Sequence, residues 1–237
     1  PNKIKNLNEI SDIVNVPKYI FFNFKSFNKN KQNIIIKIKK KFKNKIIIRS
    51  ASYEEDNTKS NAGKYLSISN IEVKNSIQIE KSIEKVFLSY GINKEKQFIL
   101  VQDYIENAES VGVIFSADPR NGSPFRTINF NNSSHTELIT SGKSNGQIIY
   151  YYNNIKKDKL EKRIYRIEKI IKKLEKKFLK INLDIEFLIF KKKIYVLQVR
   201  PLIVKKNKTI SYKKSLNDLQ KKISKMISEK SHLIGNE

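Results

Sequence analysis

The sequence predicts a mixed α+β (or α/β) domain, and three observations indicate this class. Short apolar runs end at Pro, Gly or clusters of polar residues, as buried strands do. Two longer segments, near residues 72–90 and 160–178, repeat apolar residues at helical spacing. The length of 237 residues, with 39% hydrophobic content, is sufficient for one large domain or two small ones with a real core.

The first half of the chain alternates helix and strand signals. A short amphipathic stretch, IKNLNEISDIV, precedes NVPKYIFF, where Pro17 ends the helix and an apolar strand begins. The run IIIKIKKKFKN can form a helix that leads into KIIIRSAS, a buried strand that stops at Arg49. Residues 52–71 are polar and indicate a loop that ends in a short strand. The helical spacing that follows is formed by Ile79, Ile83, Val86 and Tyr90.

The second half contains more strands and one long basic helix. Strands are expected at QFILVQDYI, SVGVIFSADP, RTINFN and GQIIYYYNN. The helix is indicated by apolar residues spaced four and three apart, namely Leu160, Ile164, Ile167, Ile171, Leu174 and Phe178. About three heptads is the minimum for a coiled coil, so packing of this helix on a sheet is the favoured interpretation. Beyond Val204 the chain becomes a lysine-rich amphipathic tail.

Net charge is the strongest compositional signal. The chain has 48 Lys and Arg against 23 Asp and Glu, a formal charge of +25, which raises the alternative of a nucleic-acid-binding protein. Lys is spread along the whole chain and is enriched together with Asn and Ile, which favours compositional bias, so nucleic acid is not expected as the main partner. Because the chain has no Cys, no apolar run of membrane-spanning length and no visible signal peptide, we expect a cytoplasmic location and no membrane partner.

The segment LDIEFLIFKKKIYVLQVRPL predicts a hairpin with one polar face. Alternation places Asp184 and Glu186 on one face, and Gln198 and Arg200 share a face on the second strand. Carboxylate and amide oxygens are the ligands that Mg²⁺ prefers, and a guanidinium matches phosphate oxygens. Together with Arg49, these residues indicate a site for a Mg-nucleotide. The same alternation also fits the solvated face of an edge hairpin, so the residues alone leave both interpretations open.

Five motifs in a fixed order resemble a known family. They are RSAS, NAG, VQDYI, VGVIFSADP and the pair DIEF and LQVRP, within residues 46–202, and NKIKNLNEISDIVNVPKYIFF precedes them. In this order they resemble the ATP-binding domain of phosphoenolpyruvate synthase and pyruvate phosphate dikinase. The resemblance implies an ATP-grasp fold, in which two subdomains with mixed or antiparallel sheets clasp the nucleotide. It implies a domain over residues 1–204, with lobes of about 1–95 and 96–204, followed by a basic helical tail over 205–237.

The resemblance also implies ATP and Mg²⁺ as ligands, and the family's motifs indicate which residues of this sequence would bind them. The positions expected to bind phosphates are Lys3, Arg49, Gly63 and Arg200. Those expected to line the adenine are Gln102, Asp103, Tyr104 and Ile105. Those expected to hold Mg²⁺ and phosphate are Asp184, Glu186 and Gln198. The expected catalytic residues are Arg49, Glu186 and Arg200. The residues alone leave a tight turn open for Gly63 and a surface position open for Lys3.

Two departures from the family pattern bear on the activity. The family's G-x-G-E glycines are missing near NNSSHTELITSG, and this segment is more similar to the subgroup that includes L-glutamine kinase. The T-x-G-G-x-x-S/C-H-A motif, which provides the phospho-accepting His of a mobile domain, is also missing, so we expect an incomplete fragment of a larger or split enzyme. The implied enzyme is an ATP-dependent kinase of dikinase type. It would pass a phosphoryl group from ATP, through a His on a downstream or separate domain, to pyruvate or an amide such as glutamine. The alternative is a degenerate module that binds nucleotide and transfers nothing.

Overall fold

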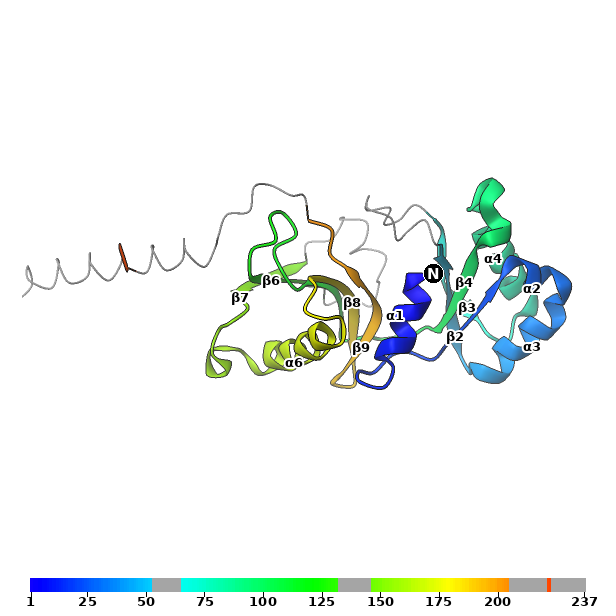
Figure 1. Cartoon of the computed structure of the whole chain (residues 1–237). Helices are drawn as coiled ribbons and strands as arrows, with labels where there is room; N and C mark the ends of the chain where they lie inside the picture. Colours follow the sequence, from blue (N-terminus) through cyan, green and yellow to red (C-terminus); the bar gives the residue numbers. More distant parts are fainter. Residues whose placement is uncertain (53–64, 132–145, 205–220, 223–237) are drawn as a thin grey trace, which may run out of the picture.

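Two antiparallel sheets organise the chain (Figure 1). The computed structural model describes residues 1–52, 65–131, 146–204 and 221–222. The first sheet has the order β1-β4-β2-β3 and consists of β1 (Tyr19–Asn23), β2 (Lys45–Ala51), β3 (Ser67–Glu72) and β4 (Phe98–Asp103). The second sheet has the order β7-β6-β5-β8-β9 and consists of β5 (Ser110–Phe115), β6 (Phe125–Asn131), β7 (Gln147–Tyr152), β8 (Leu183–Phe190) and β9 (Lys193–Pro201). Together with the helices, these antiparallel sheets confirm the expected α+β class.

Helices cover the face of the first sheet that lies away from the second sheet in Figure 1. They are α2 (Phe24–Lys29), α3 (Lys31–Lys41), α4 (Ser76–Leu88) and a 3-10 helix, Gly91–Lys96. The helices α2, α3 and α4 begin after Asn23, Asn30 and Asn75, because each of these side chains accepts a hydrogen bond from the backbone N–H three residues later. Alternate residues of the strands, such as Ile48 and Val101, pack against the helices. Their neighbours along β2 and β4 therefore face the second sheet.

One long helix covers the second sheet. This helix, α6 (Lys162–Lys177), follows a 3-10 turn at Lys157–Lys159, and α1 (Asn2–Ile10) packs beside β9 (Figure 1). The apolar stripe of α6 is buried in the same core as the inward residues of β6, β8 and β9, and consists of Ile164, Ile167, Ile171 and Leu174. This packing confirms that the stripe lies on a sheet, as the spacing favoured. Among the described residues, no helix is both long and apolar enough to cross a membrane.

The division between the lobes differs from the one expected near residues 95 and 96. Strand β4 pairs with β1 and β2, so the first sheet continues to Asp103. Helix α1, although it comes first in the chain, contributes Ile4, Leu7 and Ile10 to the core beneath the second sheet. The physical reason is that strand pairing and burial, rather than position along the chain, determine the lobes. Of the expected helical tail, only residues 221–222 lie among those described.

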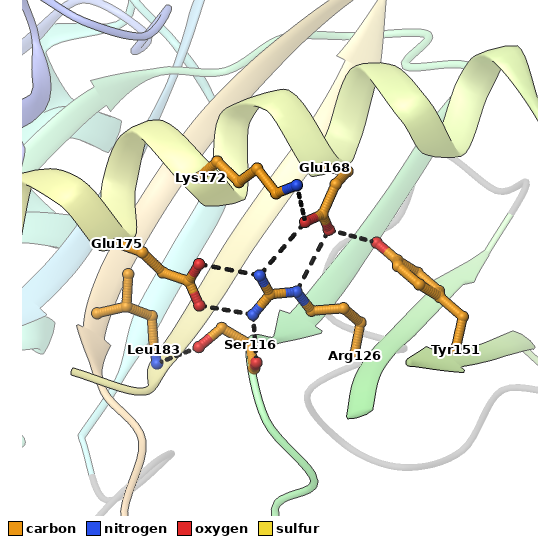
Figure 2. Close-up of polar contacts among 7 residues, drawn as sticks. All are labelled: Ser116, Arg126, Tyr151, Glu168, Lys172, Glu175 and Leu183. Carbon is orange, nitrogen blue, oxygen red and sulfur yellow. Dashed lines mark hydrogen bonds and ion pairs between the residues drawn. The ribbon is translucent and has the colours of Figure 1, made fainter. Parts of the chain in front are cut away.

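A buried ionic cluster joins α6 to the second sheet (Figure 2). Its centre is Arg126 of β6, whose guanidinium contacts the carboxylates of Glu168 and Glu175 on α6, at distances from 2.5 to 3.3 Å. Arg126 and Glu168 are 2% and 4% exposed. The Tyr151 hydroxyl donates to Glu168 Oε2 at 2.8 Å, and Arg126 also donates to the Ser116 carbonyl. Burial and the nearby Glu168 charge raise the pKa of the Tyr151 phenol, which keeps its proton available for this bond. Every group in this cluster therefore has a partner of opposite charge or polarity.

Candidate functional site

The polar residues of the β8–β9 hairpin lie on one face of the second sheet. Asp184 is directly opposite Arg200, and Glu186 is directly opposite Gln198. The alternate residues of β8, such as Ile185 and Phe187, are buried in the core beneath α6. The four polar side chains therefore face away from α6, toward the first sheet.

A β-bulge gives this hairpin its polar face. The pairing shifts between Glu186, opposite Gln198, and Phe187, opposite Val196, so Leu197 is an extra residue in β9. Val196 and Val199 are both buried in the core, although they are an odd number of positions, three, apart along the strand. Without the bulge, Val196 and Gln198 would share a face, and either the core or the polar face would lose a residue. Simple alternation, on which the sequence prediction depended, does not reveal this shift.

Arg49 connects the two sheets at this face. It lies in β2, and its Nη2 donates to Glu186 Oε2 at 2.7 Å and to Gln198 Oε1 at 3.3 Å. Its Nη1 donates to Gln102 Oε1, in β4, at 3.4 Å. The Nε of Arg49 is buried and has no hydrogen-bond partner among the described residues. Lys3 lies close by, since its Nζ donates to the Ser50 carbonyl at 2.8 Å.

The two carboxylates of the hairpin differ in their electrostatic environment. Burial opposes ionisation of Glu186, but the charge and hydrogen bond of Arg49, with the charges of Lys3 and Arg200, outweigh it and lower the pKa of this carboxyl. Burial raises the pKa of Asp184, and Arg200 offsets this only in part. Arg200 nevertheless contacts Asp184 Oδ2 through Nε at 2.8 Å and through Nη2 at 2.6 Å. The environment thus favours the ionised form of Glu186 and disfavours the ionised form of Asp184.

The donor set of the hairpin fits a hard cation that is shared with another ligand. Asp184, Glu186 and Gln198 offer only oxygen ligands, on adjacent strands. Among the described residues, no cluster of three or more His, Cys, Asp or Glu side chains could hold a metal alone. Mg²⁺ normally uses one or two carboxylates and completes its shell with water and phosphate oxygens. Two carboxylates and an amide are therefore compatible with Mg²⁺ bound together with a polyphosphate.

An apolar cluster adjoins the charged residues on the same face. Its buried members are Ala108, Val111 and Leu188, and the half-buried side chains packed against them are Ile105, Phe190, Tyr195 and Leu197. Leu188 follows Glu186 by two residues in β8, so the two side chains share a face. The face consequently has a charged half and an apolar half.

The expected adenine-lining residues separate into two groups. The Gln102 side chain reaches Arg49, and Ile105 belongs to the apolar cluster. Asp103 lies on the opposite face of β4 from Gln102, and its amide donates to the Lys18 carbonyl. The Tyr104 amide donates to the Lys45 carbonyl, so both amides are used within the first sheet.

Two predicted features cannot be placed. Gly63, expected over the terminal phosphate, and the segment NNSSHTELITSG beyond its first residue lie outside the described residues.

Sequence reasoning missed a second charged group, at the β5–β6 turn. The buried Asp118 carboxylate accepts hydrogen bonds from the Arg120 backbone and guanidinium and from the Tyr150 hydroxyl, at 2.6 to 3.0 Å. The hydrogen bonds and charge of Arg120 hold the pKa of this carboxyl well below its usual range. The only sequence signal was Asp118-Pro119, which indicated the end of a strand. This carboxylate organises the turn.

Comparisons with known proteins identify the fold. No protein-family model and no curated protein matches the sequence. The structure of PH1788 from Pyrococcus horikoshii Ot3 is similar with a TM-score of 0.56 and 12% identity, over 84% of this chain and 89% of that one. D-alanyl-alanine synthetase A from Vibrio cholerae O1 biovar eltor str. N16961 is similar with a TM-score of 0.50 and 16% identity, over 85% of this chain.

The chain spans about half the length of the ligase structures, 55% of the Vibrio cholerae protein and 50% of the D-Alanine-D-Alanine Ligase from Helicobacter pylori. At these identities the similarity concerns the fold. The molecule has an α+β, ATP-grasp-like fold with two antiparallel sheets, which confirms the fold that the resemblance implied.

Proposed function

We propose that this domain binds Mg-ATP between its two sheets. The observation that supports the proposal most directly is the meeting of Arg49 from the first sheet with Glu186 and Gln198 from the second. Cationic and anionic groups from two separate sheets converge there, beside Arg200 and Lys3. Guanidinium groups match phosphate oxygens, and the carboxylates match a divalent cation.

Nucleotide binding would exchange partners within this set of charges. A triphosphate would attract Arg49 and Arg200, which are now paired with Glu186 and Asp184. The released carboxylate oxygens, with Gln198, would then hold Mg²⁺, which neutralises phosphate charge when bound. The unpartnered Nε of Arg49 adds donor capacity that the protein itself does not use among its described residues. Without nucleotide, the carboxylates thus take the place of the phosphates beside the arginines, and the arginines take the place of Mg²⁺ beside the carboxylates.

The apolar half of the face supports a position for the base. The half-buried side chains of Ile105 and Leu197, which pack against the buried Val111 and Leu188, offer an apolar surface. Leu188 lies two residues along β8 from Glu186. An aromatic base gains from such burial, whereas the phosphates need the charged half. A nucleotide that spans both halves therefore explains why one face has two kinds of surface.

The finer proposal is a phosphotransferase of the phosphoenolpyruvate synthase and pyruvate phosphate dikinase type, over residues 1–204, with residues 205–237 leading to further domains. Its support is the order of motifs in the sequence, including the departures that favour the L-glutamine kinase-like subgroup. In this proposal, Arg49 and Arg200 hold and neutralise the phosphates while a His of another domain accepts the phosphoryl group. Pyruvate or an amide such as glutamine would then receive it.

Calorimetric titration of Mg-ATP into the purified chain tests nucleotide binding. We expect saturable, Mg²⁺-dependent binding that Glu186→Ala weakens about tenfold or more, because a charged ligand group is lost. Arg200→Ala should weaken it similarly, since it removes a phosphate donor. Glu95→Ala changes an exposed carboxylate outside the site and is the matched control.

Three results would contradict parts of the proposal. Equal binding by wild type and Glu186→Ala would remove the assignment of this site. Steeply salt-dependent binding of any DNA duplex, indifferent to Glu186→Ala, would instead favour the nucleic-acid alternative. Mg-ATP binding without AMP formation, in the presence of a His-carrying partner domain, would favour a module that binds nucleotide without turnover.

A further inference from the structure

Neutral polar side chains lie along β6, on the same face of the sheet as Glu186. In β6, Ile128 and Phe130 are buried in the core beneath α6, so Thr127 and Asn129 face the other side. The strand register aligns this row with the hairpin. Asn129 is opposite Val113, which is in turn opposite Glu186.

The same register relates Thr127 to Asp184, through Phe115 of β5. Two strand spacings, about 9–10 Å, therefore separate the β6 row from the carboxylates of β8. The intervening side chains of β5, Val113 and Phe115, offer no hydrogen-bonding groups. A ligand that extends from Glu186 across β5 would next meet polar atoms at Thr127 and Asn129.

Both residues have a side-chain polar atom without a hydrogen-bond partner in the described part of the chain. Thr127 Oγ1 and Asn129 Oδ1 are buried and have no hydrogen-bond partner among the described residues. Leaving such groups unpaired costs about 1–3 kcal/mol each. A phosphate oxygen can remove this cost at the Thr127 hydroxyl, which donates, whereas Asn129 Oδ1 only accepts, so the Asn129 amide meets a phosphate through its NH₂ end. The surroundings of Asn129 also depend on a glycine, because a Cβ at Gly146 would lie 2.4 Å from Asn129 Oδ1. A side chain at position 146 would thus displace this amide.

We propose that Thr127 and Asn129 bind the terminal phosphate of the nucleotide held at Glu186. The inference rests on the proposed function and extends it to a residue pair on β6. The Thr127 hydroxyl can donate to a phosphate oxygen, and the Asn129 amide can do so when its NH₂ end turns toward the ligand. A triphosphate that crosses β5 reaches this row, whereas the single phosphate of AMP stays at the charged half. The row therefore discriminates nucleotides by the number of their phosphates.

The test is calorimetric titration of the full chain with Mg-ATP, Mg-ADP and AMP. The variants are Thr127→Val and Asn129→Leu, singly and together, and Asn129→Asp, which keeps the side-chain shape and adds a negative charge near the phosphate. Asn154→Leu, at an exposed position after β7, is the matched control. We expect the double variant to lose about tenfold or more in affinity for ATP and to retain its affinity for AMP. Asn129→Asp should lower the affinity for ATP more than the affinity for ADP.

The design separates failure of this inference from failure of the proposed function. If the wild type binds Mg-ATP and every β6 variant binds it equally well, the β6 assignment is overturned and the site at Glu186 stands. If the double variant loses ATP and AMP affinity to the same extent, the residues act on the fold and the assignment is also overturned. If the wild type binds none of the three nucleotides, both are overturned together.

Discussion

Two arginines, the buried Arg126 and the half-buried Arg49, show how residues of the same type can have different roles. Arg126 lies between a sheet and a helix of one lobe, and its five N–H groups have five acceptor contacts, to Glu168, Glu175 and the Ser116 carbonyl. Arg49 lies between the lobes and has, within the described part of the chain, three hydrogen bonds, two of them at 3.3 Å or longer, and an Nε without a partner. A saturated arginine stabilises a structure, whereas an unsaturated one retains capacity for a ligand.

Their carboxylate partners show the same difference. Glu168 also accepts from Tyr151 and contacts Lys172 at 3.6 Å, so its charge is balanced from several sides (Figure 2). Glu186 has one direct ion pair with the described residues, to Arg49 at 2.7 Å. Removing an arginine should therefore affect stability most at the first cluster and ligand binding most at the second.

The largest effect is expected for Arg126→Met. This change leaves Glu168 and Glu175 without their buried cation, so we expect the free energy of unfolding to fall by about 3–5 kcal/mol. Urea denaturation followed by circular dichroism measures it, with Arg166→Met at an exposed position as the control. Glu175→Gln, a milder change at the edge of the cluster, keeps the comparison measurable if Arg126→Met does not fold. If the free energy of unfolding falls by less than about 0.5 kcal/mol in both variants, as for a surface substitution, the cluster does not stabilise the fold as described.

A smaller loss of stability, with a larger loss of function, is expected for Arg49→Met. Since Arg49 makes fewer and longer contacts, the free energy of unfolding should fall by about 1–3 kcal/mol. Mg-ATP affinity should fall about tenfold or more, because a phosphate donor is removed. Both quantities are measured on the same preparation, by urea denaturation and calorimetry. The comparison breaks if Arg49→Met destabilises the protein as much as Arg126→Met while nucleotide affinity is retained.

The smallest effect is the opposite pH dependence of the two site carboxylates. Glu186 has a lowered pKa, so its charge stabilises the fold above its unfolded pKa, and this contribution is lost as pH falls through the folded pKa. Asp184 has a raised pKa, so its charge destabilises the fold at neutral pH, and this penalty is relieved as pH falls through the folded pKa.

Urea denaturation between about pH 7 and pH 4 checks these signs. On acidification, the stability of the wild type relative to Glu186→Gln should decrease, and its stability relative to Asp184→Asn should increase. Two trends of the same sign would show that the carboxylates do not differ as described.

The two clusters were not equally predictable from sequence. The polar residues of the hairpin alternate with apolar ones in each strand, so the sequence predicts that each pair shares a face. They are Asp184 and Glu186 in one strand, and Gln198 and Arg200 in the other. In the other cluster, Glu168 and Glu175 lie seven residues apart on a lysine-rich helix, where acidic residues indicate a solvated surface. The weak signal was the helical spacing: Glu168 lies among the buried residues of α6, and Glu175, which is half-buried, follows the buried Ile171 by four residues.

Contacts between distant segments were beyond sequence reasoning as well. No local pattern shows that Arg49 meets Glu186, 137 residues later, or that β4 closes the first sheet rather than opening the second. Such pairings depend on the tertiary fold, which periodicity does not encode. The resemblance supplied the fold, and the structure supplied the contacts.

The bulge at Leu197 changes which residues of β9 face the core on either side of it. The strand consists of two half-strands of opposite phase, since the side chains in the core beneath α6 are even-numbered before Leu197, at Ile194 and Val196, and odd-numbered after it, at Val199. Without the bulge, the alternation that begins at Ile194 and Val196 would place Gln198 in the core and Val199 on the polar face. The proposed nucleotide site therefore depends on one extra residue in β9, Leu197, whose own side chain has no polar atom.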